Sequence, residues 1–230
     1  MALARHESSS KNAVLWLGGD FVSGWLHEEL VATDWCTPLQ AVHWVCQKLY
    51  NGICDVLTEF SELTVICSPG NHGRLTHRPV AKQNAYTAYD WLIYSMLKSW
   101  FGNMSGLDFI IPAEGDNLIS INKHPFFFTH GNNLGAKGGN GEIGVIGPIM
   151  RGRSRILNSM ASMNMQFKTL VMGHVHQPIW MPNKGVIVNP ALCGYDEYAK
   201  MNRYTAGPPS QLLFFVHHEF GPVLPIEVYL

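Results

Sequence analysis

The sequence predicts an α/β fold, built as a single domain over residues 1–230. Two observations predict it. Short apolar runs typical of buried strands alternate with longer segments of helical periodicity, and further strand candidates then follow one another without helices between them. A chain of 230 residues is long enough to bury a sizeable core. We therefore expect an α/β sandwich.

Four runs are expected to form the central strands. They are rich in Val, Ile, Leu and Phe, nearly continuous and bounded by turn residues, as is typical of strands buried on both faces. These runs are AVLWLG (13–18), LTVIC (63–67), FFFTH (126–130) and TLVMG (169–173). The later strand candidates are GVIVN (185–189), QLLFFVH (211–217) and PVLPIEVYL (222–230).

Three segments between the strands are expected to be helices. Residues 37–60 place apolar residues three and four apart after a Thr-Pro start, which suits a helix N-terminus. Residues 83–101 and 148–163 show the same periodicity. The glycine-rich segment 131–147 is expected to be a long ordered loop. Its formal G-x-G-x-x-G (Gly139, Gly141, Gly144) neither directly follows a strand nor opens a helix, so we do not interpret it as a dinucleotide site.

Composition excludes several classes of protein. Hydrophobic residues make up 47% and charged residues 14%, which is typical of a globular chain. The apolar runs are too short to span a bilayer, and residues 1–12 contain no apolar core of a secretory signal, so we expect no membrane partner. The formal net charge of −1 argues against broad attraction to nucleic acid, although it leaves room for a local basic groove. Five cysteines without a C-x-x-C pair favour a reducing compartment, and we expect the cytoplasm.

Residues that can bind a metal follow each of the four central runs. They are Asp20 after the first, Asn71 and His72 after the second, His130 at the end of the third, and His174 and His176 after the fourth. In α/β sheets, sites form at the carboxyl ends of strands, where the loops gather. One carboxylate, one amide and several imidazoles brought together there predict a metal site.

Each piece taken alone has a simpler interpretation. An Asp after Gly-Gly is usually a turn residue, and Asn-His after Pro-Gly is usually a loop. His130 alone would more often be a hydrogen-bonded core histidine, and His174 and His176 alone a pair of surface histidines in a turn. The coincidence of all four favours the metal site.

The residue types suit a two-metal centre. Two metals roughly 3.5–4 Å apart need a bridging anion, which Asp20 would supply. In an extended segment residues i and i+2 point the same way, so His174 and His176 can each serve a different metal. Asn71 adds an amide oxygen without charge, and its neighbour His72 is left free to act on substrate.

The motifs GGD, GNHGR, THG and GHVH resemble those of the calcineurin-like metallophosphoesterases, whose signature runs D-x-H, G-D, G-N-H, H and G-H-x-H in this order. The resemblance covers about residues 13–192, including VNPALCG where the family often has Asn-Pro-Gly-Ser. GDFVSGWLHEEL together with GNHGR looks most like phosphoesterases of phage and bacterial genomes, which places the expected cytoplasm in a bacterial or phage-infected cell. The resemblance implies two mixed β-sheets flanked by helices.

Carried over residue by residue, the resemblance makes Asp20 the bridging ligand of up to two divalent ions. Asn71, His130 and His174 would complete one metal site, and His176 would belong to the other. Manganese is the first expectation, and iron or zinc suit these ligands as well. A hydroxide held between the metals would attack phosphorus in line.

Two further residues receive roles from the same resemblance. His72 would protonate the leaving oxygen or stabilise the transition state. Arg74 would grip a phosphate oxygen, since its guanidinium fork suits that geometry. A solvated loop arginine is an equally good interpretation of Arg74.

One part of the family signature is absent. The sequence contains no D-x-H, and the 19 residues before Asp20 hold His6 but no Asp. The second metal would then have Asp20 and His176 alone, which is too few ligands for a tight site. We expect that the family's first strand is missing, which would expose a sheet edge. The chain would be a fragment, a member that starts late, or one that has given up a metal.

The leading interpretation is a metal-dependent phosphodiesterase or nuclease acting on nucleotides or nucleic acid. Lys137, Arg151 and Arg153 near the glycine-rich loop could bind such a substrate, with aromatic side chains stacking on bases. Aromatic residues within the expected helices, such as Trp91 and Tyr94, are more simply core. One alternative is a phosphomonoesterase or protein phosphatase. Another is a non-catalytic scaffold or truncated inactive member with the same fold. The sequence leaves the substrate and the oligomeric state open.

Overall fold

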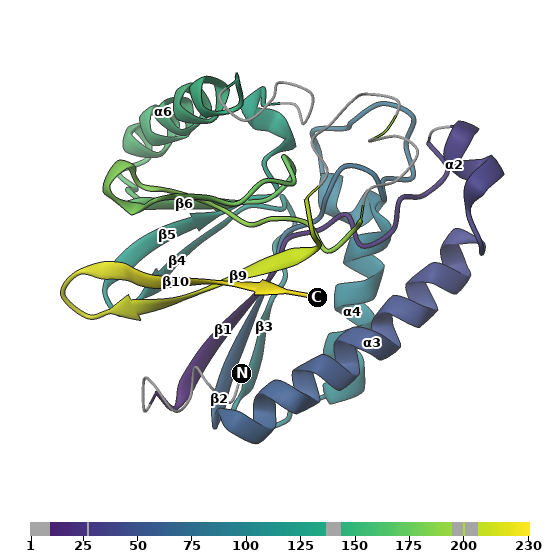
Figure 1. The fold of residues 1–230 in the computed structure, drawn as a ribbon, viewed down its shortest axis with the longest axis horizontal. Coiled ribbons are helices and arrows are strands. Elements are labelled where there is room, and N and C mark those ends of the chain that lie inside the picture. The colour runs from purple at the N-terminus through teal and green to yellow at the C-terminus, as the bar shows by residue number, and fades with distance from the viewer. Residues whose placement is uncertain (1–9, 27, 137–143, 195–199, 201–206) are drawn as a thin grey trace. The chain divides into compact units, whose positions relative to one another are not determined.

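A computed structural model describes residues 10–26, 28–136, 144–194, 200 and 207–230. His6, Lys137, Gly139 and Gly141 lie outside the described residues. The chain divides into two units, Met1–Asp116 and Asn117–Leu230. Both contain helices and sheets with parallel strands, so the predicted α/β class is confirmed (Figure 1).

The first unit is built on a parallel three-stranded sheet in the order β1-β2-β3 (Figure 1). Its strands are β1 (Asn12–Leu17), β2 (Glu62–Cys67) and β3 (Leu107–Ile110), and its helices are α2 (Glu28–Thr33), α3 (Pro38–Glu59), η1 (Asn84–Thr87) and α4 (Tyr89–Phe101). The core packs α3 and α4 against the sheet through residues such as Cys46, Ile53, Val65, Ile93 and Leu97. Both strands and the long helix predicted for this unit are therefore present.

Helix α3 begins where the sequence indicated. The Thr37 side chain accepts a bond from the Gln40 backbone N–H, and the Gln40 side chain accepts one from the Thr37 N–H, which forms a capping box. Pro38 occupies the first turn, where its missing N–H costs nothing.

The single helix predicted over 83–101 is wrong in one respect, because the chain breaks at Ala88. That residue is extended (φ −125°, ψ 145°) and separates η1 from α4. It forms an isolated antiparallel bridge with Arg74, and the Tyr89 N–H donates to the Gly73 carbonyl. These bonds to the loop after β2 replace the helical ones.

The second unit is built on a mixed five-stranded sheet in the order β4-β5-β6-β8-β7. Its strands are β4 (Asn117–Ile121), β5 (His124–Phe128), β6 (Thr169–Met172), β7 (Ile179–Met181) and β8 (Val186–Val188), and a separate hairpin joins β9 (Ser210–His217) to β10 (Gly221–Tyr229). The central strands β5, β6 and β8 are parallel, and the outer two are antiparallel. The helices are η2 (Asn132–Leu134), α6 (Ile146–Ser162) and η4 (Pro182–Lys184). Within the described residues, no helix is both long and apolar enough to cross a bilayer.

Six short elements among the described residues have no counterpart in the sequence prediction: α2, β3, β4, η2, β7 and η4. Strand β4 shows why. It pairs with β5 through a turn whose central residues, Asn122 and Lys123, both have positive φ (47° and 68°). That backbone suits a two-residue hairpin, but the sequence lacks the glycine that usually signals one.

Candidate functional site

Asp20 and the Asn71-His72 pair are brought together at one end of the first unit's sheet. Strands β1 and β2 run parallel and in register up to Leu17 and Cys67, so both following loops leave the same edge. The Asp20 carboxylate accepts a hydrogen bond of 2.7 Å from the backbone N–H of His72. One predicted ligand is therefore held by the backbone of the predicted catalytic residue.

Two glycines allow the loops after β1 and β2 to approach this closely. Gly19 has a positive φ of 87°, and a Cβ placed on it would lie 2.7 Å from the Gly70 Cα. A Cβ on Gly70 would in turn meet the carboxylate and backbone of Asp20. No side chain fits at either position, so the GGD and PGN sequences are needed for packing as well as for turning.

Asp90, which the sequence analysis did not identify, organises both loops. Its fully buried carboxylate accepts backbone N–H bonds from Asp20 (3.0 Å), Phe21 (3.2 Å) and Gly70 (2.8 Å). The pKa of Asp90 is raised to about 6, because burial and then the nearby Asp20 charge raise it by more than the three N–H bonds lower it.

A sequence signal for Asp90 did exist. Asp90, Ile93, Tyr94 and Leu97 follow the i, i+3, i+4, i+7 spacing of one helix face, and all four are buried. An acidic residue on an otherwise apolar helix face needs a buried partner, which predicts a polar contact without saying to what.

Tyr94 contacts the same two strand ends from one helical turn further along α4. Its hydroxyl lies 3.2 Å from the Leu17 carbonyl oxygen and 2.9 Å from that of Ser68, and it is the donor to both. The side chain is 1% exposed, so the expectation that Tyr94 is core is met, with a polar role added.

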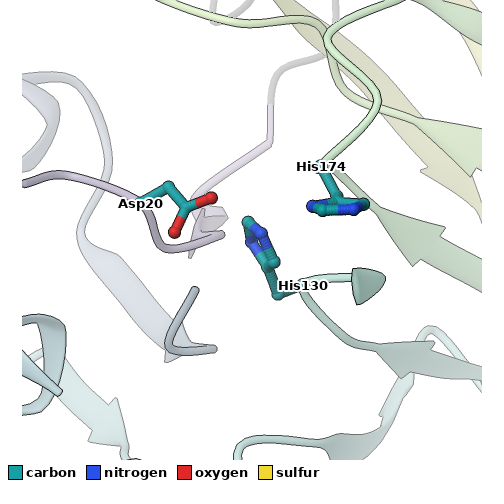
Figure 2. A group of neighbouring side chains, drawn as sticks. All are labelled: Asp20, His130 and His174. Atoms are coloured by element: carbon teal, nitrogen blue, oxygen red, sulfur yellow. The ribbon is translucent and has the colours of Figure 1, made fainter. Parts of the chain in front are cut away.

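In the second unit, His130 and His174 lie side by side (Figure 2). His130 follows β5 and His174 follows β6; the two strands pair in parallel. Their ring centroids are 5.1 Å apart, and ring nitrogens of the two lie within 4.8 Å. The Gly173 N–H donates to the His130 carbonyl at 3.1 Å, which fixes one loop on the other. His130 is buried and His174 half-buried.

The expectation that 174–176 is extended is wrong. His174 and His176 both have left-handed backbones (φ 67° and 60°), and the Val175 N–H donates to the Gly173 carbonyl at 2.8 Å. The turn buries Val175, which is 2% exposed, and leaves His176 exposed with its Nδ1 3.9 Å from the Cys193 sulfur. Burial of Val175 thus leaves the two histidines in different surroundings, with His174 half-buried and His176 exposed.

Arg74 is bound to its own loop. Its Nε donates to the Thr76 carbonyl (3.1 Å), Nη1 to that of Asn71 (2.6 Å) and Nη2 to that of His77 (3.3 Å). All three nitrogens of the guanidinium therefore stabilise the shape of the loop that carries Asn71 and His72. Arg74 would have to bind a phosphate oxygen while it keeps these three hydrogen bonds.

Arg153, considered above as a substrate contact, packs within the second unit. Its Nε donates to the Gly185 carbonyl (2.9 Å) and Nη2 to that of Lys168 (2.8 Å), while the guanidinium lies over the Phe167 ring. Arg151 is exposed. These contacts give Arg153 a structural role at the start of β6 and β8.

Comparison of the chain with models of protein families and with curated proteins gave no match in either case.

Proposed function

We propose that the chain is a metal-dependent phosphoester hydrolase whose principal metal ligands are Asp20, His130 and His174. The observation that carries the proposal is the pair formed by His130 and His174, whose ring centroids are 5.1 Å apart and which each offer a ring nitrogen within 4.8 Å of the other (Figure 2). The order of the GGD, GNH, TH and GHVH motifs supports the same assignment. The α/β sandwich and the membership of the calcineurin-like family are part of this proposal.

The donor chemistry fits a divalent transition metal. One carboxylate, two imidazoles and the amide of Asn71 are the mixed oxygen and nitrogen ligands that manganese, iron and zinc accept. Such an ion would supply Lewis acidity at a phosphoryl oxygen and a nucleophilic hydroxide near neutral pH.

The chain's own residues would orient the ligands and move protons. The His72 N–H holds the Asp20 carboxylate, while the His72 side chain is the candidate to protonate the leaving oxygen. Arg74 fixes the loop on which His72 lies through its three carbonyl contacts. We propose phosphodiesters, in nucleotides or nucleic acid, as the leading substrate class and phosphomonoesters as the alternative.

We propose one tight metal site and a second, weaker one. His176 is exposed, and the sequence contains no D-x-H to add ligands. Asp20 and His176 alone would hold a second ion weakly. This shortage of ligands is also what favours the non-catalytic scaffold as the second candidate.

Metal content and hydrolysis measured together test the proposal. After loading with manganese and desalting, elemental analysis should give about one equivalent, and bis-p-nitrophenyl phosphate should be hydrolysed faster than p-nitrophenyl phosphate. His174→Ala should lose both the metal and the turnover. His43→Ala, which changes an exposed histidine on α3, should lose neither. Metal without turnover would favour the scaffold, and failure of the wild-type chain to retain any metal would refute the proposed site.

A further inference from the structure

The Asp90 carboxylate joins two loops that are far apart in the sequence. Its Oδ2 accepts from the N–H groups of Asp20 and Gly70, and its Oδ1 accepts from that of Phe21. Asp20 and Phe21 follow β1, whereas Gly70 follows β2 and directly precedes Asn71. One side chain therefore binds the backbone of both segments that carry expected ligands in the first unit.

Capping of α4 does not explain why an acidic residue is buried at position 90. The residue lies in the first turn of α4, where an acidic side chain would ordinarily bond to N–H groups of that helix. Ala88 is the N-cap and makes no side-chain capping bond, and the N–H groups that donate to the Asp90 carboxylate belong to the two loops.

Holding a carboxylate in the core is costly, so its bonds must offset a desolvation penalty of several kcal/mol. Two oxygens can accept all three converging N–H groups, whereas an apolar residue of the same size would leave those groups without this acceptor. Tyr94 complements this on the same helix face, because its hydroxyl donates to carbonyls of the same two chain segments.

We propose that Asp90 is a positioning residue, which holds the Asp20 backbone and the loop of Asn71 and His72 in the arrangement needed for metal binding. The bond to the Asp20 N–H holds a residue with a left-handed backbone (φ 58°). The His72 N–H then orients the carboxylate of that residue. The metal-binding part of this inference rests on the proposed function; the loop-holding part does not.

Asp90→Asn in the full-length chain tests both parts. The amide retains one acceptor oxygen but turns an NH2 group toward a loop N–H, so the three bonds can no longer all form. Asp108→Asn, at an exposed position on β3 of the same unit, is the matched control.

The first measurement is amide hydrogen exchange in metal-free protein, and the second is Mn²⁺ titration followed by electron paramagnetic resonance. We expect Asp90→Asn to accelerate exchange at the amides of Asp20, Phe21 and Gly70 at least tenfold, with the β2 amides unchanged. We also expect it to weaken Mn²⁺ binding at least tenfold. Asp108→Asn should match the wild type in both measurements.

The outcomes separate the two proposals. Unchanged exchange at the three amides overturns the positioning role, whether or not the wild type binds Mn²⁺. Faster exchange with wild-type affinity for Mn²⁺ overturns its link to the metal. Faster exchange in a chain whose wild type binds no Mn²⁺ overturns the proposed function and leaves the loop-holding role standing. If the variant does not fold, through-hydrogen-bond couplings from the Asp90 carboxyl carbon to the three amide nitrogens in the wild type decide the loop-holding role, and their absence overturns it.

Discussion

Gly19→Ala should strongly destabilise the first unit, and Gly52→Ala should slightly stabilise it. Gly19 lies between β1 and Asp20, with a φ of 87° and the Gly70 backbone directly against the place of its Cβ. Gly52 lies inside α3, where an added Cβ would meet nothing within 4 Å. The same one-methyl change is thus made at a crowded loop and at an open helix position.

The expected magnitudes follow from these surroundings. A left-handed backbone costs an alanine about 1–2 kcal/mol. Pushing a Cβ to 2.7 Å from the Gly70 Cα forces the loops apart, at an overpacking cost of about 1–3 kcal/mol. Together these lower the free energy of unfolding by about 2–5 kcal/mol. In α3 the exchange of Gly for Ala raises the free energy of unfolding by about 0.5–1 kcal/mol.

Urea unfolding followed by tryptophan fluorescence measures these changes in the unit concerned, because every tryptophan except Trp180 lies within residues 1–116. Gly19→Ala should also weaken Mn²⁺ binding, since the displaced Gly70 loop carries Asn71. A Gly19→Ala variant as stable as the wild type would refute the close approach of the two loops. Destabilisation by Gly52→Ala of the same size would show that the method does not resolve the local effect.

Three further predictions concern single groups. Tyr94→Phe should lower the free energy of unfolding by about 1–3 kcal/mol, because two buried carbonyls lose their donor; Tyr86→Phe, at a side chain 46% exposed, should change it little in the same urea titration. Burial raises the pKa of Cys46 to about 11, so little of this thiol ionises as the pH rises from 7 to 9. Ellman's reagent should therefore label the exposed Cys193 over that pH range, but Cys46 only after unfolding. Labelling of both at equal rates in native protein would contradict the burial of Cys46. His176→Gly should be more stable than His176→Ala by about 1 kcal/mol, since φ 60° suits glycine, and equal stabilities would argue against the left-handed backbone.

The strands and the long helices could be predicted because their signals are local. The apolar runs at 13–18 and 63–67 match β1 and β2 to within one residue at each end. Thr37 and Pro38 fix the start of α3. The break at Ala88 could not be predicted in this way. Its cause is a bridge to Arg74, a loop residue fourteen positions earlier whose place depends on the folded chain.

The candidate site, too, could be predicted only where its signals are local in the sequence. The residue types and the strand ends on which they lie were visible in the sequence, and the structure does place His72 against Asp20 and His130 beside His174. The helix periodicity marks Asp90 as a buried polar residue, but its three partners could not be predicted, because they are backbone N–H groups, which have no sequence signature.

Backbone conformation adds an argument that the sequence does not contain. Asp20, His174 and His176 all have φ near +60°, a region in which a residue with a Cβ is strained by about 1 kcal/mol or more. Asp and His enter this region more readily than most residues, so the conformation by itself fits a simple turn as well as a site. Burial of Val175 in the core anchors the turn, with one histidine on each side of it. A turn that only reversed the chain would be less strained with glycine at both ends. With histidines at these positions, contacts that glycine could not make must offset the strain, and the His174 ring makes one of them with the ring of the buried His130.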